Sequence, residues 1–224
     1  MVSAILRTDK LCKSFSNGGR QQHVIKNMDL EIMENDFTII MGASGSGKST
    51  LLYALSGMDK PSVGKIYFAD KEIQDYSNDE LAVFRRGNCG FVFQSVYLLE
   101  NQTVLDNVLT GALIVQKNSP KLVQKAKDLL IRVGIKEEMW NKYPNQLSGG
   151  EAQRVGIVRA IINDPKILFA DEPTGALDVN TSAEIMKEFK RLNEEGMTIV
   201  IITHDMDVAN ACQRVVEISD GEIV

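Results

Sequence analysis

One stretch, Met41–Leu51, constrains the fold of this chain more than any other. It reads MGASGSGKSTL and contains the spacing G-x-x-x-x-G-K-[ST], filled by Gly42, Gly47, Lys48 and Ser49. The apolar run at residues 37–41 precedes it and has the length and β-branched content of a buried strand. The apolar run that follows, residues 50–55, indicates the start of a helix. The sequence therefore predicts a strand, a glycine-rich loop and a helix in direct succession.

This order suits the binding of phosphate groups. Glycine lets the backbone turn tightly where a Cβ would clash, and successive amides, with the N–H groups at the helix start, then form an anion-binding nest. Lys48 supplies a positive charge for the β- and γ-phosphates, and the Ser49 hydroxyl suits Mg²⁺. A chance glycine- and serine-rich loop is the alternative, but the flanking strand and helix favour a nucleoside triphosphate site. The predicted ATP contacts here are Gly42, Ala43, Ser44, Gly45, Ser46, Gly47, Lys48, Ser49 and Thr50.

Length and composition describe an ordinary globular chain. With 224 residues, 44% hydrophobic and 25% charged, it can bury one core, or one core with a smaller lobe. The net charge of −5 gives no support for nucleic acid as a partner, and no apolar run approaches the roughly 18 residues needed to cross a bilayer. The N-terminus does not resemble a signal peptide. Three widely spaced cysteines fit neither a disulfide framework nor a zinc site, so we expect reduced thiols in the cytoplasm.

The hydrophobic pattern divides the chain into strand-rich and helix-rich regions. Residues 4–40 look like strands separated by turns, with a hairpin turn at residues 16–19. Residues 96–160 change to helical character, including a helix that Ser119 caps and Pro120 begins. Because strands return after this region, we expect it to form a helical lobe inserted into an α/β core.

Polar residues stand at the carboxyl ends of three predicted core strands. Gln94 follows the strand at residues 90–93, although a lone glutamine there is usually a loop residue. Asp171 and Glu172 follow the strand at residues 167–170, where one acid can hold Mg²⁺ and the other can polarise the attacking water. His204 ends the strand at residues 198–203. Such strand ends meet at one rim, so these groups and the phosphate loop predict a catalytic site.

Two further features have more than one interpretation. The segment LSGGE at residues 147–151 opens a helix, and Ser148 with Glu151 forms the pattern of a capping box. The double glycine at 149–150 equally fits close approach to an anion at the helix N-terminus. Phe15, just before the first hairpin turn, either stacks on a purine or belongs to the core, and position alone favours the core.

Taken together, the segments GASGSGKST, FVFQ, LSGGE, ILFADEP, GALD and ITHD, in this order, resemble the nucleotide-binding subunit of an ABC transporter. The resemblance covers almost the whole chain. It implies an α/β fold of the P-loop NTPase class, with a mainly parallel core sheet, an N-terminal antiparallel β subdomain and a helical insert. The core and β subdomain would take residues 1–94 and 161–224, and the helical subdomain residues 95–160.

The resemblance also implies roles for individual residues. It implies a head-to-tail homodimer that holds two ATP, each between the phosphate loop of one subunit and Ser148, Gly149, Gly150 and Glu151 of the other. Phe15 resembles the residue that stacks on adenine, Glu172 the catalytic base and His204 the switch histidine. Gln94 resembles the residue that links Mg²⁺ and the attacking water to the membrane partner. The implied Mg²⁺ ligands are Ser49, Gln94 and Asp171, and the implied catalytic residues are Glu172, His204, Gln94 and Lys48.

Three positions depart from the commonest family pattern. Phe15 stands where tyrosine is usual, Glu151 where glutamine is common, and Gly175 where serine is frequent. Stacking survives the change from tyrosine to phenylalanine, whereas Glu151 near a nucleotide edge is expected to weaken binding somewhat. None of the three removes a catalytic group, so we expect an active ATPase.

Within the family, the chain is similar to the ATPases of macrolide exporters, lipoprotein-releasing complexes and peptide-antibiotic resistance transporters. The similarity implies a motor subunit, peripheral to the cytoplasmic face of the membrane. Its implied partner is an integral permease with a large extracytoplasmic domain, which the loop after Gln94 through about Val108 would contact. The chain stops just after its last predicted strand, as it would if a fused membrane domain had been removed.

Two other functions remain open. One is a regulatory ATPase that controls a cell-wall hydrolase or a sensor kinase through a membrane partner, and nothing in the sequence separates it from export. The other is a soluble ABC-type ATPase acting on DNA or the ribosome. The DNA-repair members carry a long coiled coil that this chain lacks, and the translation factors carry two cassettes where this chain has one.

Overall fold

The computed structural model describes residues 3–209 and 212–224. Its strands are β1 Ala4–Asn17, β2 Arg20–Met28, β3 Glu31–Met33, β4 Phe37–Met41, β5 Val63–Phe68, β6 Lys71–Glu72, β7 Cys89–Phe93, β8 Ile167–Asp171, β9 Thr198–Thr203, β10 Arg214–Ser219 and β11 Glu222–Ile223. Its α-helices are α1 Lys48–Leu55, α2 Asn78–Asn88, α3 Val104–Leu113, α4 Pro120–Arg132, α5 Gly149–Ile161, α6 Val179–Glu194 and α7 Met206–Ala209. Short 3₁₀ helices lie at Glu137–Met139 and Pro144–Gln146.

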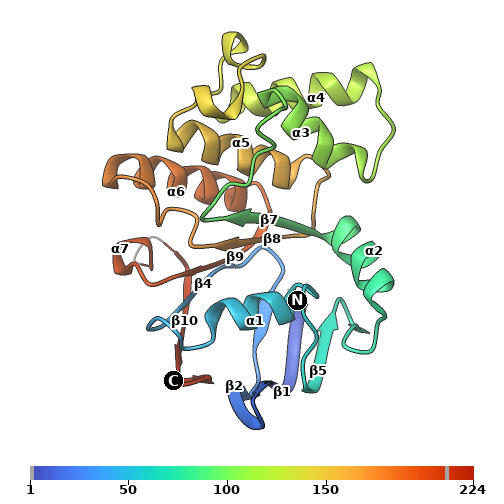
Figure 1. Ribbon diagram of the computed structural model, residues 1–224, viewed down its shortest axis with the longest axis vertical. Helices are drawn as coiled ribbons and strands as arrows, with labels where there is room; N and C mark the ends of the chain where they lie inside the picture. The colour runs from blue at the N-terminus through green and yellow to red at the C-terminus, as the bar shows by residue number, and fades with distance from the viewer. Residues whose placement is uncertain (1–2, 210–211) are drawn as a thin grey trace.

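Two sheets form the lower part of the molecule in Figure 1. One has the strand order β11-β10-β4-β9-β8-β7, and its pairs from β10 to β7 are all parallel. The other is antiparallel, with the order β2-β1-β5-β6 and β3 beside β1. The parallel core and the N-terminal antiparallel region therefore confirm the fold class expected from the sequence.

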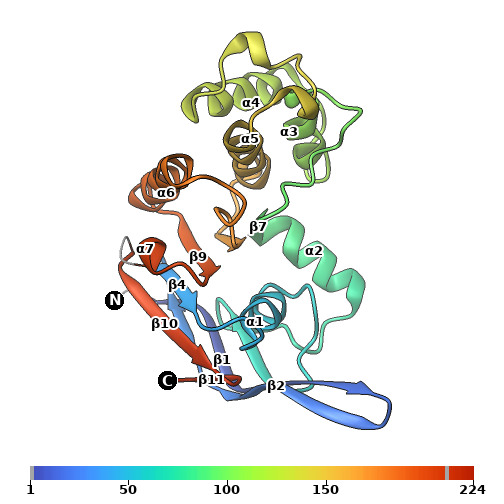
Figure 2. The ribbon, with the colours of Figure 1, turned by 60° about the vertical axis from the view of Figure 1, so that its left-hand side comes forward.

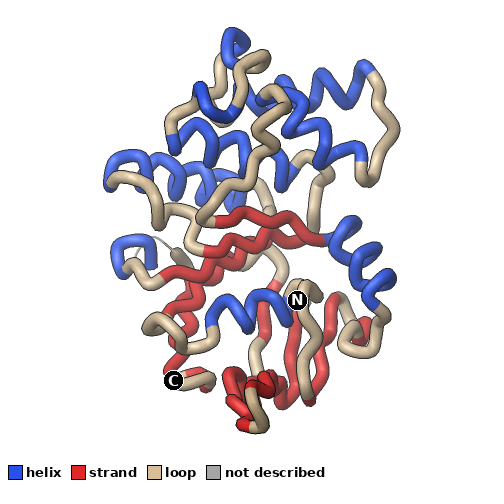
Figure 3. The backbone as a smooth tube through the Cα atoms, viewed as in Figure 1, coloured by secondary structure: helices blue, strands red, loops and turns tan. Residues whose placement is uncertain are grey.

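The central parallel strands β4, β8 and β9 are mostly apolar and buried along nearly their whole length, as expected where both faces of a sheet are covered. Alternate residues serve alternate faces: Ile40 of β4 packs toward α1 and the antiparallel sheet, and Ile39 packs toward α5 and α6. Val200 and Ile201 of β9 divide in the same way. Figure 3 shows the parallel sheet between the helical layer and the second sheet.

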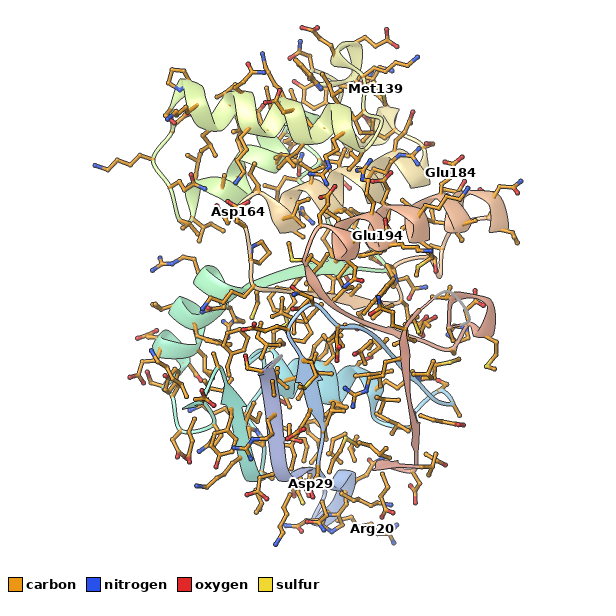
Figure 4. All side chains as sticks on the ribbon, turned by 180° about the vertical axis from the view of Figure 1, so that it is seen from behind. Arg20, Asp29, Met139, Asp164, Glu184 and Glu194 are labelled. Carbon is orange, nitrogen blue, oxygen red and sulfur yellow. The ribbon has the colours of Figure 1, made fainter. Side chains whose placement is uncertain are left out.

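The helical region has a core of its own. Buried residues of α3, α4 and α5, with Trp140 and Met139 from the segment between α4 and α5, pack together in a third apolar cluster. This region stands beyond α6, away from the antiparallel sheet (Figures 1 and 2). Its far end, marked by Met139, is labelled in Figure 4. The division of the chain at residues 95 and 160 stays a prediction, because α5 joins both parts: Val155 lies in the third cluster and Ile157 in the core cluster on the sheet.

Side-chain caps fix the helix starts that the sequence indicates. Ser119 caps α4 by accepting a hydrogen bond from the Leu122 N–H, and Pro120 is the first helical residue. Asp178 caps α6 by accepting from the N–H groups of Asn180 and Thr181. The helix after the phosphate loop begins at Lys48, two residues before the apolar run from which the sequence predicts it. Gly47, the residue before this helix, has φ 103°, in the left-handed region.

Candidate active site

The predicted catalytic residues lie at the carboxyl ends of the parallel strands, along one rim of the sheet. Met41 of β4 pairs with Thr203 of β9, and Asp171 of β8 is a neighbour of both Ile202 and Phe93. The phosphate loop, Gln94, Glu172 and His204 directly follow these strand ends. They line one open pocket of about 820 Å³, whose other lining residues are Gln22 and Val24 of β2. The convergence that the sequence predicts is therefore present in the structure.

The phosphate loop encloses the ammonium group of Lys48. This side chain is buried, and its Nζ donates hydrogen bonds of 2.8 Å to the carbonyl oxygens of Gly42 and Ala43. The pocket is lined by Ala43, Ser44, Gly45, Gly47, Lys48, Ser49 and Thr50 of the predicted ATP contacts. Gly42 and Ser46 lie outside that lining, and Ser46 is buried. The loop thus holds the Lys48 ammonium group beside the start of α1, where phosphate oxygens meet both its positive charge and N–H donors.

Oxygen ligands for a cation lie beside the loop. The Ser49 hydroxyl is 3.4 Å from Oδ1 of Asp171, and the Tyr53 hydroxyl donates to Oδ2 of the same carboxylate at 3.1 Å. A serine hydroxyl and a carboxylate are the hard donors that Mg²⁺ prefers next to nucleotide phosphates, so the donor set fits this ion. Burial raises the pKa of Asp171, and the nearby Glu172 carboxylate adds to that rise.

Glu172 is held at both carboxylate oxygens. Thr203 Oγ1 donates to Oε2 at 3.0 Å, and His204 Nδ1 lies 2.8 Å from Oε1. The contact suits the imidazole tautomer that carries its proton on Nδ1, with the Glu172 oxygen as acceptor. The backbone of Glu172 has φ 48°, in the left-handed region, and its N–H donates to the Ile202 carbonyl at 2.9 Å. Backbone strain of this kind gathers at functional sites, where surrounding contacts keep the residue in place.

Gln94 lies close to the segment that carries Gly175. A Cβ added at Gly175 would come 2.9 Å from Gln94 Nε2. The glycine that stands where serine is frequent therefore leaves space for the Gln94 amide in this arrangement. A serine here would require that amide to move.

The LSGGE segment lies elsewhere. Ser148 and Glu151 form a reciprocal capping box at the start of α5: the Ser148 N–H donates to Glu151 Oε2 at 2.7 Å, and the Glu151 N–H donates to Ser148 Oγ at 3.3 Å. The bond from the Ser148 N–H, and after it the bond that the Ser148 hydroxyl donates to the same Oε2 at 2.9 Å, lower the pKa of Glu151. Gly150 is packed so tightly that an added Cβ would lie 2.4 Å from Cγ2 of Thr181 on α6. Both the cap and the packing explain this sequence locally, and none of these residues lines the pocket of its own chain.

Phe15 is also apart from the pocket lining. It lies on β1 with 45% of its surface exposed, which rules out the core position that its place in the sequence favours. Lys13 Nζ lies 5.0 Å from the centre of its ring, close enough for a cation–π contact. Adenine stacking stays a prediction for this exposed ring.

Four residues contribute to the site without being predicted. Gln22 and Val24 enter the pocket from β2, a strand that carries no motif. Tyr53 and Thr203 bind the two acids at the rim. Two of them have a signal in the sequence. Tyr53 stands four residues after Ser49, and such residues share one face of a helix. Thr203 lies in the segment ITHD, directly before His204.

A phosphate loop between strand and helix, at the rim of a parallel sheet and beside two acids, defines a P-loop nucleoside triphosphatase. Residues 25–175 match the model of the ABC transporter family. The chain belongs to this family, as its ATP-binding domain.

Known relatives extend this result over nearly the whole chain. The chain is 45% identical over 98% of its length to a macrolide export ATP-binding/permease protein, MacB, of Bartonella quintana, and it spans 33% of that protein. It is 41% identical over 99% of its length to a lipoprotein-releasing system ATP-binding protein, LolD, of Idiomarina loihiensis, of which it spans 97%. The chain thus spans about a third of one kind of relative and nearly all of the other.

Solved structures agree with the fold. The dimeric post-hydrolysis state of the ATP-binding cassette MJ0796, bound to ADP and Pi, superposes with a TM-score of 0.89 at 40% identity. The superposition covers 97% of this chain and 96% of that one. The chain is therefore an ABC-type ATPase domain in fold and in family.

Proposed function

We propose that this chain is the ATP-hydrolysing motor subunit of an ABC transporter complex. The observation that carries the proposal is the paired hold on Glu172 beside the phosphate loop, by Thr203 at 3.0 Å and His204 at 2.8 Å. Glu172 is the general base that accepts a proton from the attacking water. Lys48 binds the β- and γ-phosphates, and Gln94 orients the water from the end of the adjacent strand β7.

Mg²⁺ completes the site that we propose. Ser49, Asp171 and Gln94 would hold it, and it would neutralise charge that develops on the phosphate oxygens. The residues of the chain keep their own tasks: the loop amides bind phosphate, Lys48 balances its charge, and Glu172 takes the proton.

The second half of each ATP site comes from a second copy of the chain. Ser148, Gly149, Gly150 and Glu151 stand at the N-terminus of α5, outside the pocket of their own chain. A helix N-terminus favours an anion, so in a head-to-tail homodimer this segment would face the γ-phosphate bound by the partner. The dimeric cassette bound to ADP and Pi supports this arrangement.

The motor would act on a membrane partner. No helix within residues 3–209 and 212–224 is long and apolar enough to cross a bilayer. The names of the relatives include a permease and a lipoprotein-releasing system. We infer an integral permease with a large extracytoplasmic domain, to which this chain binds peripherally at the cytoplasmic face of the membrane. ATP hydrolysis would drive this permease either to export a substrate or to transmit a mechanical movement across the membrane.

The substitution Glu172→Gln tests the core of the proposal. It removes the base and keeps the nucleotide contacts, so ATP hydrolysis should fall at least 100-fold while ATP binding persists. Light scattering should then detect a stable dimer with saturating ATP and Mg²⁺. Glu138→Gln makes the same chemical change at an exposed position of the helical region and should behave as the unmodified protein. A Glu172→Gln protein that stays monomeric would contradict the two-subunit site.

The membrane partner calls for a separate experiment. Tagged protein is recovered from gently solubilised membranes, and the proteins that copurify are identified by mass spectrometry. We expect a permease with a large extracytoplasmic domain. Recovery of ribosomal or DNA-bound proteins in place of any membrane protein would favour the soluble ATPase, with the nucleotide site unchanged.

A further inference from the structure

Two hydroxyls of one helix reach the two oxygens of one carboxylate. Ser49 and Tyr53 stand four residues apart on α1, on the same face and one turn from each other. Ser49 Oγ is 3.4 Å from Oδ1 of Asp171, and Tyr53 Oη is 3.1 Å from Oδ2. Asp171 is the last residue of β8, so these contacts join the helix after the phosphate loop to the end of the neighbouring strand.

The position of the Tyr53 hydroxyl is set by packing. The ring is partly buried and packs against the apolar cluster between α1 and the two sheets. The main chain of the residue is fixed as well, because its carbonyl accepts hydrogen bonds from the N–H groups of Met58 and Asp59, at 2.9 and 3.0 Å. Anchored at ring and backbone, the phenol presents its O–H to Asp171 with little freedom to turn away.

This contact determines which way the carboxylate faces. An aspartate side chain turns readily about its last torsion, so the plane of its carboxylate is not fixed unless a partner binds one of the oxygens. The Tyr53 hydroxyl takes up Oδ2 and leaves Oδ1 directed at Ser49, the other proposed metal ligand. Mg²⁺ requires near-octahedral geometry, so the orientation of each ligand decides how well it binds.

We propose that Tyr53 is a positioning residue for the metal ligand Asp171: its hydroxyl fixes the carboxylate so that Oδ1 and the Ser49 hydroxyl face one Mg²⁺. The inference rests on the proposed function, since it assigns a part within that ATP site. Partners of this kind, which orient a ligand without touching the metal, typically alter metal affinity 10- to 100-fold when they are removed.

Tyr53→Phe is the variant that tests it, because it deletes one oxygen and keeps the ring in the apolar cluster. Tyr76→Phe is the matched control: Tyr76 packs against the same cluster, and its hydroxyl makes no hydrogen bond among the described residues. Two binding constants are measured for each protein. Mn²⁺ binding to the complex with ADP is followed by electron paramagnetic resonance, and ADP binding without metal is followed with a fluorescent ADP analogue.

We expect the Kd for Mn²⁺ to rise about 10-fold in Tyr53→Phe, with metal-free ADP affinity unchanged. Higher Mg²⁺ should restore the kcat of ATP hydrolysis in this variant. Tyr76→Phe should match the unmodified protein in every measurement. An unchanged Kd for Mn²⁺ in Tyr53→Phe would overturn the inference, and so would an equal loss of metal-free ADP affinity, which indicates general damage to the site.

The unmodified protein separates this result from failure of the proposed function. If it bound neither ADP nor Mn²⁺ with ADP, the ATP site itself would be refuted, and Tyr53 would have no ligand to position. If it bound both and Tyr53→Phe matched it, the proposed function would stand and the role of Tyr53 would fall.

Discussion

His204 Nδ1 lies 2.8 Å from Oε1 of Glu172, and this hydrogen bond joins the ends of two adjacent parallel strands. The strands β8 and β9 bring the pair together, although the residues stand far apart in the sequence. His204 is largely exposed, with 71% of its side chain accessible, whereas the Glu172 side chain is 18% accessible. The imidazole therefore faces solvent, while the carboxylate that it contacts is largely enclosed.

The loss of this contact should slow hydrolysis. His204→Ala leaves Glu172 held by Thr203 alone, so we expect the kcat of ATP hydrolysis to fall about 10-fold or more, with ATP affinity within two-fold. A coupled assay of phosphate release measures the rate. The control is His23→Ala, since His23 is the other histidine of the chain and lies on β2, where it binds Ser14 Oγ at 2.8 Å. Full activity in His204→Ala would show that the contact has no part in catalysis.

The start of α5 should be sensitive to a single methyl group. In Gly150→Ala the new Cβ meets Cγ2 of Thr181 at 2.4 Å, so the Thr181 side chain or the starts of α5 and α6 must shift. We expect about 1–3 kcal/mol of lost stability, measured by urea unfolding. Thr181→Ser removes that methyl group and keeps the hydroxyl that donates to Asp178 at 2.6 Å. The double variant should regain most of the loss; equal stability of the single and double variants would contradict the packing explanation.

Two glycines of the phosphate loop should respond differently to alanine. Gly42 has φ 154°, and an added Cβ would lie 2.2 Å from the Ile218 carbonyl oxygen, so Gly42→Ala should not reach a stable fold. Gly45 has φ 80°, and nothing lies within 4 Å of the added Cβ. The stability of Gly45→Ala should therefore fall only by the cost of a left-handed alanine, about 1–2 kcal/mol. Urea unfolding of both variants checks the order. The reverse order would show that local strain outweighs the close contact.

The cap of α6 should make stability depend on pH in the acid range. Hydrogen bonds from the Thr181 hydroxyl first, then from the N–H groups of Thr181 and Asn180, lower the pKa of Asp178 below its usual range. A carboxylate whose pKa is lower in the folded state stabilises the fold above its unfolded pKa, about 3.9, and loses that effect as the pH falls through the folded pKa.

Asp178→Asn isolates this effect, because the amide still accepts hydrogen bonds but carries no charge. The urea midpoint of the unmodified protein should exceed that of Asp178→Asn most near pH 7, and the difference should shrink below about pH 4. Asp70→Asn, at an exposed turn between β5 and β6, serves as the control. An advantage that stays constant from pH 7 to pH 3 would mean that the charge of Asp178 contributes nothing.

The phosphate loop, the succession of strands and helices, and the polar residues at the rim could all be predicted from the amino-acid sequence. These features are local or follow from the topology of the sheet. A contiguous loop carries its own backbone chemistry, and parallel strands deliver their carboxyl ends to one edge wherever they pair. Lys48, Glu172 and His204 were predictable on that basis.

The side chains that meet across that rim could not be predicted in the same way, because their contacts depend on how distant elements pack. Tyr53 and Asp171 stand 118 residues apart, and their contact depends on how α1 lies against β8. The same holds for Val24 in the pocket lining and for the exposed position of Phe15, which the local pattern assigned to the core. Side-chain direction between distant elements is set by packing of the whole fold, and no local pattern in the sequence records it.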